Sequence, residues 1–267
     1  MARAKRHFIQ GHVWHITHRC HKREFLLKFA KDRQAWLQWL LRAKNRNHLV
    51  ILNYAVTSNH IHLLVVDEGE RDVIPRSMQL VAGRTGQEYN IRKGRKGAFR
   101  EGRYHATAIE SGDHLVRCIV YIDLNMVRAG VVNHPSEWET GGYNEIQAPR
   151  RKCALIAYGR LQSLLGFPTY DDLVAAHKRW LGEALRDGTL ERDGIWTESI
   201  AVGRRVFVET VKRQLGVRAK GRKVFDVGVG CEFWESATEY IVDSDAENSD
   251  IGLQNAFFWD INVGISS

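Results

Sequence analysis

The apolar positions along the first 148 residues follow two different patterns. Short segments rich in valine, isoleucine and leucine predict strands, at 11–20, 49–56, 60–67 and 104–110. Apolar residues at three- and four-residue spacing predict helices, at 31–47, at 75–90 and in a third segment that includes 115–126. The resulting order, βαββαβα, suits an α+β fold in which helices pack against an antiparallel sheet.

The strand predicted at 60–67 carries two histidines on one face. Because side chains alternate across a strand, His60 and His62 point the same way, while Ile61, Leu63 and Val65 face the other side. Two imidazoles placed in this way can share one cation. The pair also fits two sheet histidines satisfied by hydrogen bonds, because a His-x-His pattern is common by chance.

The helix predicted after residue 112 places candidate chemistry on one polar stripe. Its apolar stripe consists of Leu115, Cys118, Ile119, Ile122 and Met126. The neighbouring polar stripe consists of Arg117, Tyr121, Asn125 and Arg128. We expect Asn125 Oδ1 to be a third metal ligand beside the two histidines, one helical turn from the Tyr121 oxygen. Nitrogen and oxygen ligands without a thiolate favour Mg²⁺ or Mn²⁺. Without Asn125 and the histidines, Tyr121 would be interpreted as an ordinary half-buried tyrosine on an amphipathic helix.

Four segments resemble the REP-associated tyrosine transposases, a branch of the single-tyrosine transposases in the HUH endonuclease superfamily. They are 14–17, 57–65, 100–104 and 121–132, in matching order and spacing. The resemblance implies a ferredoxin-like antiparallel sheet with packed helices. It also implies His60, His62 and Asn125 as ligands of a divalent metal and Tyr121 as the nucleophile that attacks DNA. The chain departs from the family at Met126, where proline is usual, and this departure removes no catalytic group.

The implied activity is that of a metal-dependent endonuclease and strand transferase acting on single-stranded DNA at or near palindromic hairpins. A tyrosine phenol is a poor nucleophile near neutral pH because its ordinary pKa is about 10. A divalent cation offsets this difficulty by neutralising charge on the phosphate and orienting it for in-line attack. The predicted product is a 5′-phosphotyrosine with a free 3′-hydroxyl, and an incoming 3′-hydroxyl can reverse the step without ATP.

Two other functions stay open from the sequence. A domesticated protein that binds hairpin DNA without cleaving it would depend on neither Tyr121 nor a metal. A metal-dependent hydrolase of another substrate would use water in place of Tyr121 but would still depend on His60. We favour the transposase because a noncleaving binder has no physical need for the complete set of ligands and phenol.

The charge distribution favours a nucleic-acid partner. The 267-residue chain has 39 Lys+Arg against 31 Asp+Glu, and residues 1–100 alone hold 20 basic and 7 acidic side chains. The tract 86–103 is predicted to be a loop or hairpin that tracks a DNA backbone, with a solvated charged surface as the alternative. The predicted DNA-binding residues are Arg92, Lys93, Arg95, Lys96, Arg100, Arg103, Arg117 and Arg128.

The character of the chain changes after residue 148. We predict a catalytic domain at 1–148, a basic helical extension at 149–223 and an acidic tail at 224–267. Helical patterning occurs at 170–186 and at about 199–215, and 201–223 holds eight basic residues and one acidic. The tail has nine Asp and Glu and no Lys or Arg. It either solvates the terminus or competes with DNA for the basic surface, and the aromatic run 257–259 suggests that it docks.

The remaining histidines and the cysteines are assigned no metal. His12, His15, His18 and His21 recur every third residue, but a strand sends successive members to opposite faces, so we expect structural or DNA-facing roles. The four cysteines are far apart without a Cys-x-x-Cys pair, which argues against a zinc knuckle or a disulfide framework and favours a reducing cytoplasm. No apolar stretch is long enough to span a bilayer, so no membrane partner is expected. We expect a monomer, with oligomeric state left open.

Overall fold

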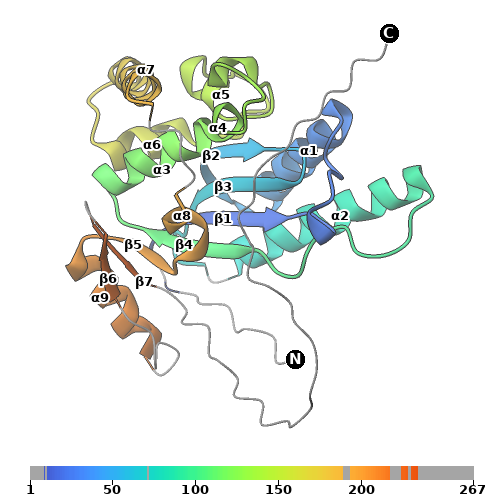
Figure 1. Cartoon of the computed structure of the whole chain (residues 1–267), viewed down its shortest axis with the longest axis horizontal. Helices are drawn as coiled ribbons and strands as arrows, with labels where there is room; N and C mark the ends of the chain where they lie inside the picture. The colour runs from blue at the N-terminus through green and yellow to red at the C-terminus, as the bar shows by residue number, and fades with distance from the viewer. Residues whose placement is uncertain are drawn as a thin grey trace, which may run out of the picture. The chain divides into compact units, whose positions relative to one another are not determined.

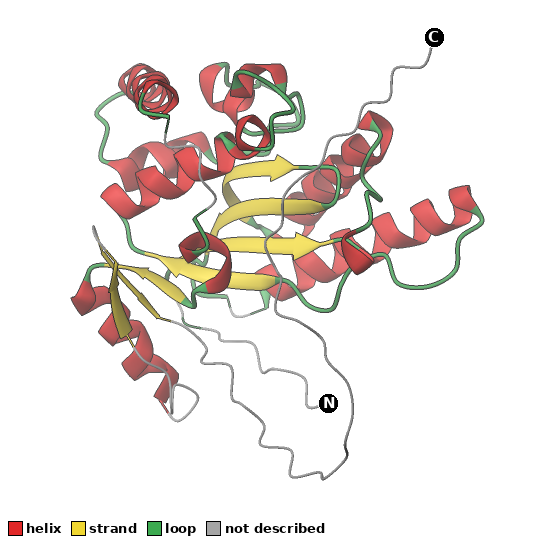
Figure 2. Ribbon diagram, in the orientation of Figure 1, coloured by secondary structure: helices red, strands yellow, loops and turns green. Residues whose placement is uncertain are grey.

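The computed structural model describes residues 9, 11–70, 72–188, 193–216, 224–227 and 230–233. The strands are β1 (Val13–Arg19), β2 (Val50–Val56), β3 (His60–Val66), β4 (His105–Ile109), β5 (Ala201–Gly203), β6 (Val224–Val227) and β7 (Gly230–Phe233). The helices are α1 (Ala30–Asn47), α2 (Val73–Lys93), α3 (Asp113–Asp123), α4 (Asn125–Arg128), α5 (Tyr143–Gln147), α6 (Tyr158–Leu165), α7 (Tyr170–Arg186), α8 (Ile195–Glu198) and α9 (Arg205–Leu215), with short 3-10 helices η1 (His21–Arg23) and η2 (Pro135–Glu137). The fold is therefore α+β, as predicted (Figure 2).

The first four strands form an antiparallel sheet in the order β2-β3-β1-β4. Together with α1 and α2 this is the ferredoxin-like βαββαβ arrangement. In the register of β1 with β3, Thr17 is paired with His62 and Arg19 with His60. His60 and His62 share one face of β3, as predicted, since their Nε2 atoms lie 3.0 Å apart. Both faces of the strand are covered, because Leu63 and Leu64 are each 0% exposed. α1 and α2 lie side by side, joined by a hydrogen bond from Asn47 Nδ2 to Ser77 Oγ of 3.0 Å (Figure 1).

The sheet continues into the part of the chain after residue 148. β5 is parallel to β4, and β7 and β6 follow in antiparallel pairing. The predicted mostly helical extension is confirmed for the described residues, since α6, α7, α8 and α9 lie within it. The domain boundaries themselves stay predictions, although one sheet crosses 148. Residues 234–267 of the predicted acidic tail, with the aromatic run 257–259, lie outside the described residues.

The structure corrects two predicted elements. The helix expected at about 199–215 begins only at Arg205, because residues 201–203 pair with the edge of β4 as β5. The loop expected from 86 is helical as far as Lys93, and Gly94 then ends α2 with a left-handed φ of 57°. Glycine adopts that conformation without a Cβ penalty. Arg92 and Lys93 therefore lie on the last turn of α2.

The predicted tyrosine helix is divided at Leu124. α3 ends at Asp123 and α4 begins at Asn125, while Leu124 has a ψ of 1°. Met126, at the position where the resembled family usually has proline, is buried at 4% exposure in α4. The division occurs without proline, so its cause lies in the contacts of neighbouring side chains. No helix among the described residues is both long enough and apolar enough to cross a membrane.

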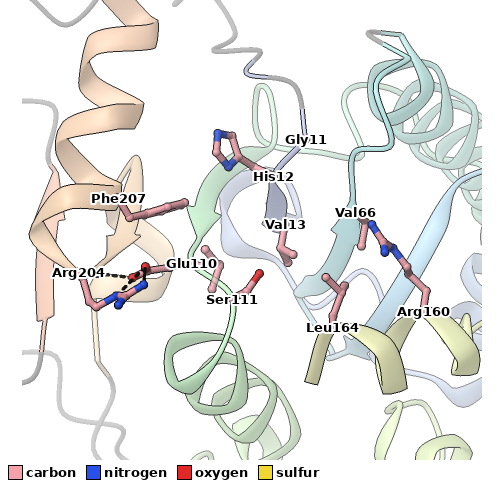
Figure 3. A pocket seen from close by; sticks show the side chains of 11 residues that line it. Gly11, His12, Val13, Val66, Glu110, Ser111, Arg160, Leu164, Arg204 and Phe207 are labelled. Atoms are coloured by element: carbon pink, nitrogen blue, oxygen red, sulfur yellow. Dashed lines mark hydrogen bonds and ion pairs between the residues drawn. The ribbon is translucent and has the colours of Figure 1, made fainter. Parts of the chain in front are cut away.

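A buried carboxylate joins the two parts of the sheet. Glu110, which follows β4, accepts hydrogen bonds from the Arg204 backbone N–H and from Arg204 Nε at 2.8 Å (Figure 3). Arg204 in turn immediately precedes α9. Burial alone raises the pKa of Glu110, but these hydrogen bonds outweigh burial and hold the pKa below its ordinary value. The carboxylate is thus favoured in the folded state.

Loss of this carboxylate should destabilise the protein in a pH-dependent way. Because the folded pKa of Glu110 lies below the unfolded one, its stabilisation is present above the unfolded pKa and is lost as the pH falls through the folded value. We expect Glu110→Gln to lower the free energy of unfolding at pH 7 and to match wild type more closely below pH 4, as measured by urea unfolding. Glu209→Gln, which breaks an exposed pair with Arg205, is the control and should have little effect. Equal effects of the two substitutions would contradict this role.

Candidate active site

The two histidines predicted on β3 bring their outer ring nitrogens together. His62 is buried at 1% exposure and His60 is half-buried. Their Nε2 atoms lie 3.0 Å apart, with the rings inclined at 77°. If neither Nε2 atom carries a hydrogen, two lone pairs face each other at this distance. A cation or a shared proton between the nitrogens is then required. The hydrogen-bond partners of the opposite ring nitrogens decide this question.

A buried chain of hydrogen bonds defines the tautomer of His62. His15 Nδ1 lies 2.8 Å from the Trp196 carbonyl oxygen, which can only accept, so that nitrogen carries the proton. Burial lowers the pKa of His15 to about 4, so the ring is neutral and its Nε2 has no proton. His15 Nε2 lies 2.9 Å from His62 Nδ1, which must therefore donate. Burial, with the neighbouring His60, also lowers the pKa of His62 well below its ordinary value. His62 Nε2 consequently carries a lone pair.

Residues that precede β3 fix the proton of His60 on Nδ1, as His15 does for His62. His60 Nδ1 lies 2.7 Å from Asn59 Oδ1 and 2.9 Å from Thr57 Oγ1. The amide oxygen can only accept, so Nδ1 of His60 donates to it, and the neutral ring then has a lone pair on Nε2. Two lone pairs thus face each other across 3.0 Å. A cation between them, or a further proton on His60, is needed to make this arrangement favourable.

The donor atoms around this gap suit a divalent cation. Two ligands at right angles, each about 2.1 Å from one ion, lie about 3.0 Å apart, which is the separation found here. Asn125 Nδ2 lies 2.9 Å from His62 Nε2, and rotation of the amide presents Oδ1 at the same place. No group of three or more His, Cys, Asp or Glu side chains in the described ranges is arranged to hold a metal ion. The candidate donor set is therefore two imidazoles and a carboxamide.

Tyr121 lies against both inner histidines. Its ring centroid is 5.8 Å from that of His62 and 6.1 Å from that of His15, in edge-to-face contact. Trp196 of α8 packs on its ring at 6.0 Å, and the Arg128 guanidinium lies 4.1 Å from the ring centroid. Tyr121 is only 7% exposed. The structure thus brings the predicted nucleophile next to the predicted ligands, and their roles stay predictions.

Arg128 also explains the division between α3 and α4. Its Nη2 donates a hydrogen bond of 2.5 Å to the Tyr121 carbonyl oxygen. A side chain that inserts into the helix hydrogen-bond ladder interrupts it without a proline. Burial lowers the pKa of Arg128, an effect that Tyr121 and Asp193 oppose. Arg128 thus holds both the backbone and the ring of Tyr121, whereas the sequence suggested a DNA contact.

A second buried network holds the end of α3. Asp123 Oδ2 accepts a 2.7 Å hydrogen bond from His177 Nε2 of α7, and its Oδ1 accepts one of 3.0 Å from Asn53 of β2. Gln147 of α5 lies 2.8 Å from His177 Nδ1. Asp123 and His177 side chains are each 1% exposed. The segment between Tyr121 and Asn125 is therefore held by β2 and α7, and α5 in turn holds His177.

The other predicted DNA-binding residues occupy different surroundings. Arg92 pairs with the buried Asp32, Lys93 lies over the Phe29 ring, and Arg95 pairs with Glu24. Arg100 is buried and donates to the His18 carbonyl oxygen at 3.0 Å. Lys96, Arg103 and Arg117 are exposed, as are the Arg92 and Lys93 side chains despite their contacts. DNA binding by any of them stays a prediction.

His15 and Trp196 belong to the site but are not among the site residues predicted from the sequence. The position of His15 can be inferred from strand alternation, because the odd-numbered residues of β1 point to the same face of the sheet as His62. His12 and His18 lie on the opposite face, as the alternation predicts: His12 packs on Phe207 and His18 contacts Tyr104. No local pattern indicates Trp196, which lies 181 residues from His15 in the chain.

A separate hollow lies at the other end of β1. It has a volume of about 220 Å³ and is lined by residues that include His12, Val13, Glu110, Arg160, Arg204 and Phe207 (Figure 3). Val13 begins β1, whereas the paired residues Arg19 and His60 lie at its far end. The hollow is therefore distinct from the candidate active site.

No protein-family model and no curated protein matches the chain. Several solved structures are similar to it, among them the following two. One is described as a REP-associated tyrosine transposase bound to a REP hairpin, with 19% identity over 56% of this chain and 87% of that chain, and a TM-score of 0.47. The other, from Deinococcus radiodurans, is described as a candidate transposase, with 13% identity over 49% and 92% and a TM-score of 0.32. Both scores are below 0.5, so the similarities support no argument about function by themselves.

Removal of the His15 ring should weaken divalent-cation binding at the two histidines. Outer partners that orient a ligating histidine typically contribute about 10- to 100-fold in metal affinity. We expect a loss of this size for His15→Leu in an isothermal titration with Mn²⁺, because His62 Nδ1 loses its acceptor. His12 immediately precedes the same strand and faces away from His62, so His12→Leu should bind Mn²⁺ as wild type does. Unchanged affinity of the His15 variant would exclude the proposed hydrogen-bond chain as the orienting element.

Proposed function

We propose that this protein is a metal-dependent single-stranded DNA endonuclease and strand transferase that forms a 5′-phosphotyrosine intermediate at or near hairpin DNA. The observation that carries the proposal is the convergence of Tyr121, His60, His62 and Asn125 at one place. These residues come from β3, α3 and α4, which meet only in the folded protein. Neighbouring contacts from His15, Arg128 and Trp196 fix their orientation.

The residues present fit a divalent cation. His60 Nε2, His62 Nε2 and Asn125 Oδ1 would hold it, and we propose Mg²⁺ or Mn²⁺ because the set contains an amide oxygen and no thiolate. When bound, such a cation neutralises charge on the non-bridging oxygens of a DNA phosphate. The buried surroundings of His62 strengthen every electrostatic interaction at this point, since little water screens them.

The chain's own residues then supply the nucleophile and its placement. The Tyr121 oxygen forms a bond to phosphorus, the bond from phosphorus to the 3′-oxygen breaks, and the leaving oxygen takes up a proton while the phenol loses one. Arg128 holds the ring and the backbone of Tyr121 in one orientation. An ordered nucleophile avoids the entropy cost of bringing it into line with the phosphate.

Hairpin DNA is proposed as the substrate on the strength of the sequence resemblance and the charge distribution. The first 100 residues carry 20 basic and 7 acidic side chains, which suits a polyanion. Lys96 and Arg103 of the predicted basic tract are exposed on the segment between α2 and β4.

Tyr121→Phe should abolish covalent attachment to DNA while DNA binding stays within about threefold of wild type. The phenyl ring keeps the contacts with His62 and Trp196 but has no oxygen to attack phosphorus. The measurement uses labelled single-stranded hairpin oligonucleotides with Mn²⁺ and denaturing electrophoresis of the protein–DNA adduct.

Tyr170→Phe serves as the matched control for that experiment. Its hydroxyl donates to the Ile146 carbonyl oxygen in α5 and is remote from the histidines. The control should form the adduct at the wild-type level. An adduct of normal yield in the Tyr121→Phe variant would exclude Tyr121 as the nucleophile.

A second candidate function, binding of hairpin DNA without cleavage, is favoured by one feature of the site. Asn125 Nδ2 lies 2.9 Å from His62 Nε2, and Tyr121 is 7% exposed, so these contacts also fit a structural role without a metal. A pure binder should show affinity that is indifferent to Tyr121→Phe and to EDTA, with no adduct from wild type. An adduct that disappears on addition of EDTA would exclude this alternative.

A further inference from the structure

An exposed aromatic segment lies next to the candidate active site. Residues 20–29, which we call the strap, connect β1 to α1. Leu26 and Leu27 bury their side chains at 6% and 0% exposure, whereas Phe25 and Phe29 are 53% and 51% exposed. Single exposed apolar residues are ordinary on a protein surface, but two phenylalanines in one short anchored segment are not explained by packing.

The strap is tied to the residues that immediately precede His60. Cys20 N donates to the Asn59 carbonyl oxygen at 2.7 Å, and Leu27 N donates to the Ser58 carbonyl oxygen at 2.9 Å. The Asn59 side chain also accepts the hydrogen bond from His60 Nδ1. Asn59 therefore orients a predicted metal ligand and anchors the strap, so the exposed rings are held in a fixed relation to the site.

The backbone of the strap is strained where it begins. Lys22 and Arg23 are consecutive non-glycine residues with left-handed φ angles of 51° and 58°. This conformation is unfavourable for residues with a Cβ and persists where the surrounding structure imposes it, most often at functional sites. Both side chains are exposed on η1. The strain thus places two basic side chains at the surface beside the active site.

Charge around the phenylalanines suits a polyanion. The Lys93 ammonium lies 5.3 Å from the Phe29 ring centroid, and Lys28 is exposed between the two rings in sequence. Within residues 20–33 the two acidic side chains are already paired, Glu24 with Arg95 and Asp32 with Arg92. Aromatic faces among cations are the combination that binds single-stranded nucleic acids, with bases stacked on rings and phosphates beside ammonium groups.

We propose that Phe25 and Phe29 of the strap form a stacking site for unpaired bases of single-stranded DNA that flank the phosphate held at His60 and His62. The choice of single-stranded DNA as the ligand rests on the proposed function. A strand cleaved at the active site extends beyond the bound phosphate, and its unpaired bases then need a binding surface nearby. Stacking is tolerant of sequence, since every base offers an aromatic face. The strap then holds the strand by its bases while the active site holds one phosphate.

The test compares binding of two short fluorescent oligonucleotides of equal length by anisotropy, one of thymidines and one of abasic sites. The abasic strand keeps the phosphates and lacks the bases. We expect Phe25→Ala and Phe29→Ala each to weaken oligothymidine binding by roughly 5- to 150-fold. Binding of the abasic strand should stay near the wild-type level. Phe25→Leu, which keeps apolar area without an aromatic face, should lose oligothymidine affinity as well.

Phe225→Ala is the matched control, because Phe225 is 47% exposed on β6, the strand farthest from β2 in the sheet order. It should bind both strands as wild type does. The proposal is overturned if the strap variants bind oligothymidine normally, if they lose both strands equally, or if Phe225→Ala loses as much. Restored binding by Phe25→Leu would assign the surface to an apolar partner such as a peptide or a second copy of this chain, and would equally overturn it.

The covalent adduct through Tyr121 is measured separately on the same proteins. In one outcome, the strap variants lose oligothymidine binding but keep abasic-strand binding while wild type forms no adduct. That result would support the strap as a DNA site and exclude the cleavage proposal. If wild type forms the adduct and the strap variants bind oligothymidine normally, only the strap proposal is excluded. Thermal unfolding of each variant should match wild type, since neither phenylalanine is part of the core.

Discussion

The hydrogen bond between His15 and His62 is the interaction on which the candidate site depends. The Trp196 carbonyl oxygen fixes the proton of His15, His15 in turn fixes the proton of His62, and the outer nitrogen of His62 is left as a lone pair. Both rings are almost fully buried, so protonation that would break the chain is disfavoured. This orientation is what the proposed metal site requires of two histidines that also fit an ordinary structural role in the sheet.

The position of Tyr121, the proposed nucleophile, depends on contacts from beyond residue 148. α8 packs against β1 and β4 and supplies both the ring over Tyr121 and the carbonyl that binds His15. α7 supplies His177, which holds Asp123 between Tyr121 and Asn125. Catalytic geometry commonly needs such outer contacts, because the reacting groups must be fixed to within a fraction of an ångström. The extension is therefore part of the site as well as of the sheet.

Much of the core was predictable from the sequence because it depends on local periodicity. The strands β1 to β4, the helices α1 and α7 and the shared face of His60 and His62 follow from spacing alone. β5 and α8 have only three and four residues, too few for a period to show, and their places depend on contacts with β4. The division at Leu124 and the His15–Trp196 contact likewise depend on partners distant in sequence, which no local pattern records.

The most direct test of this account is the position of a divalent cation in crystals grown with Mn²⁺. The account predicts an anomalous peak about 2.1 Å from the Nε2 atoms of both His60 and His62, with Asn125 Oδ1 turned towards it. The His15–His62 hydrogen bond should be unchanged in that structure. A peak bound through Nδ1 of either histidine, or no peak at saturating Mn²⁺, would contradict the assignment of the two lone pairs and with it the proposed site.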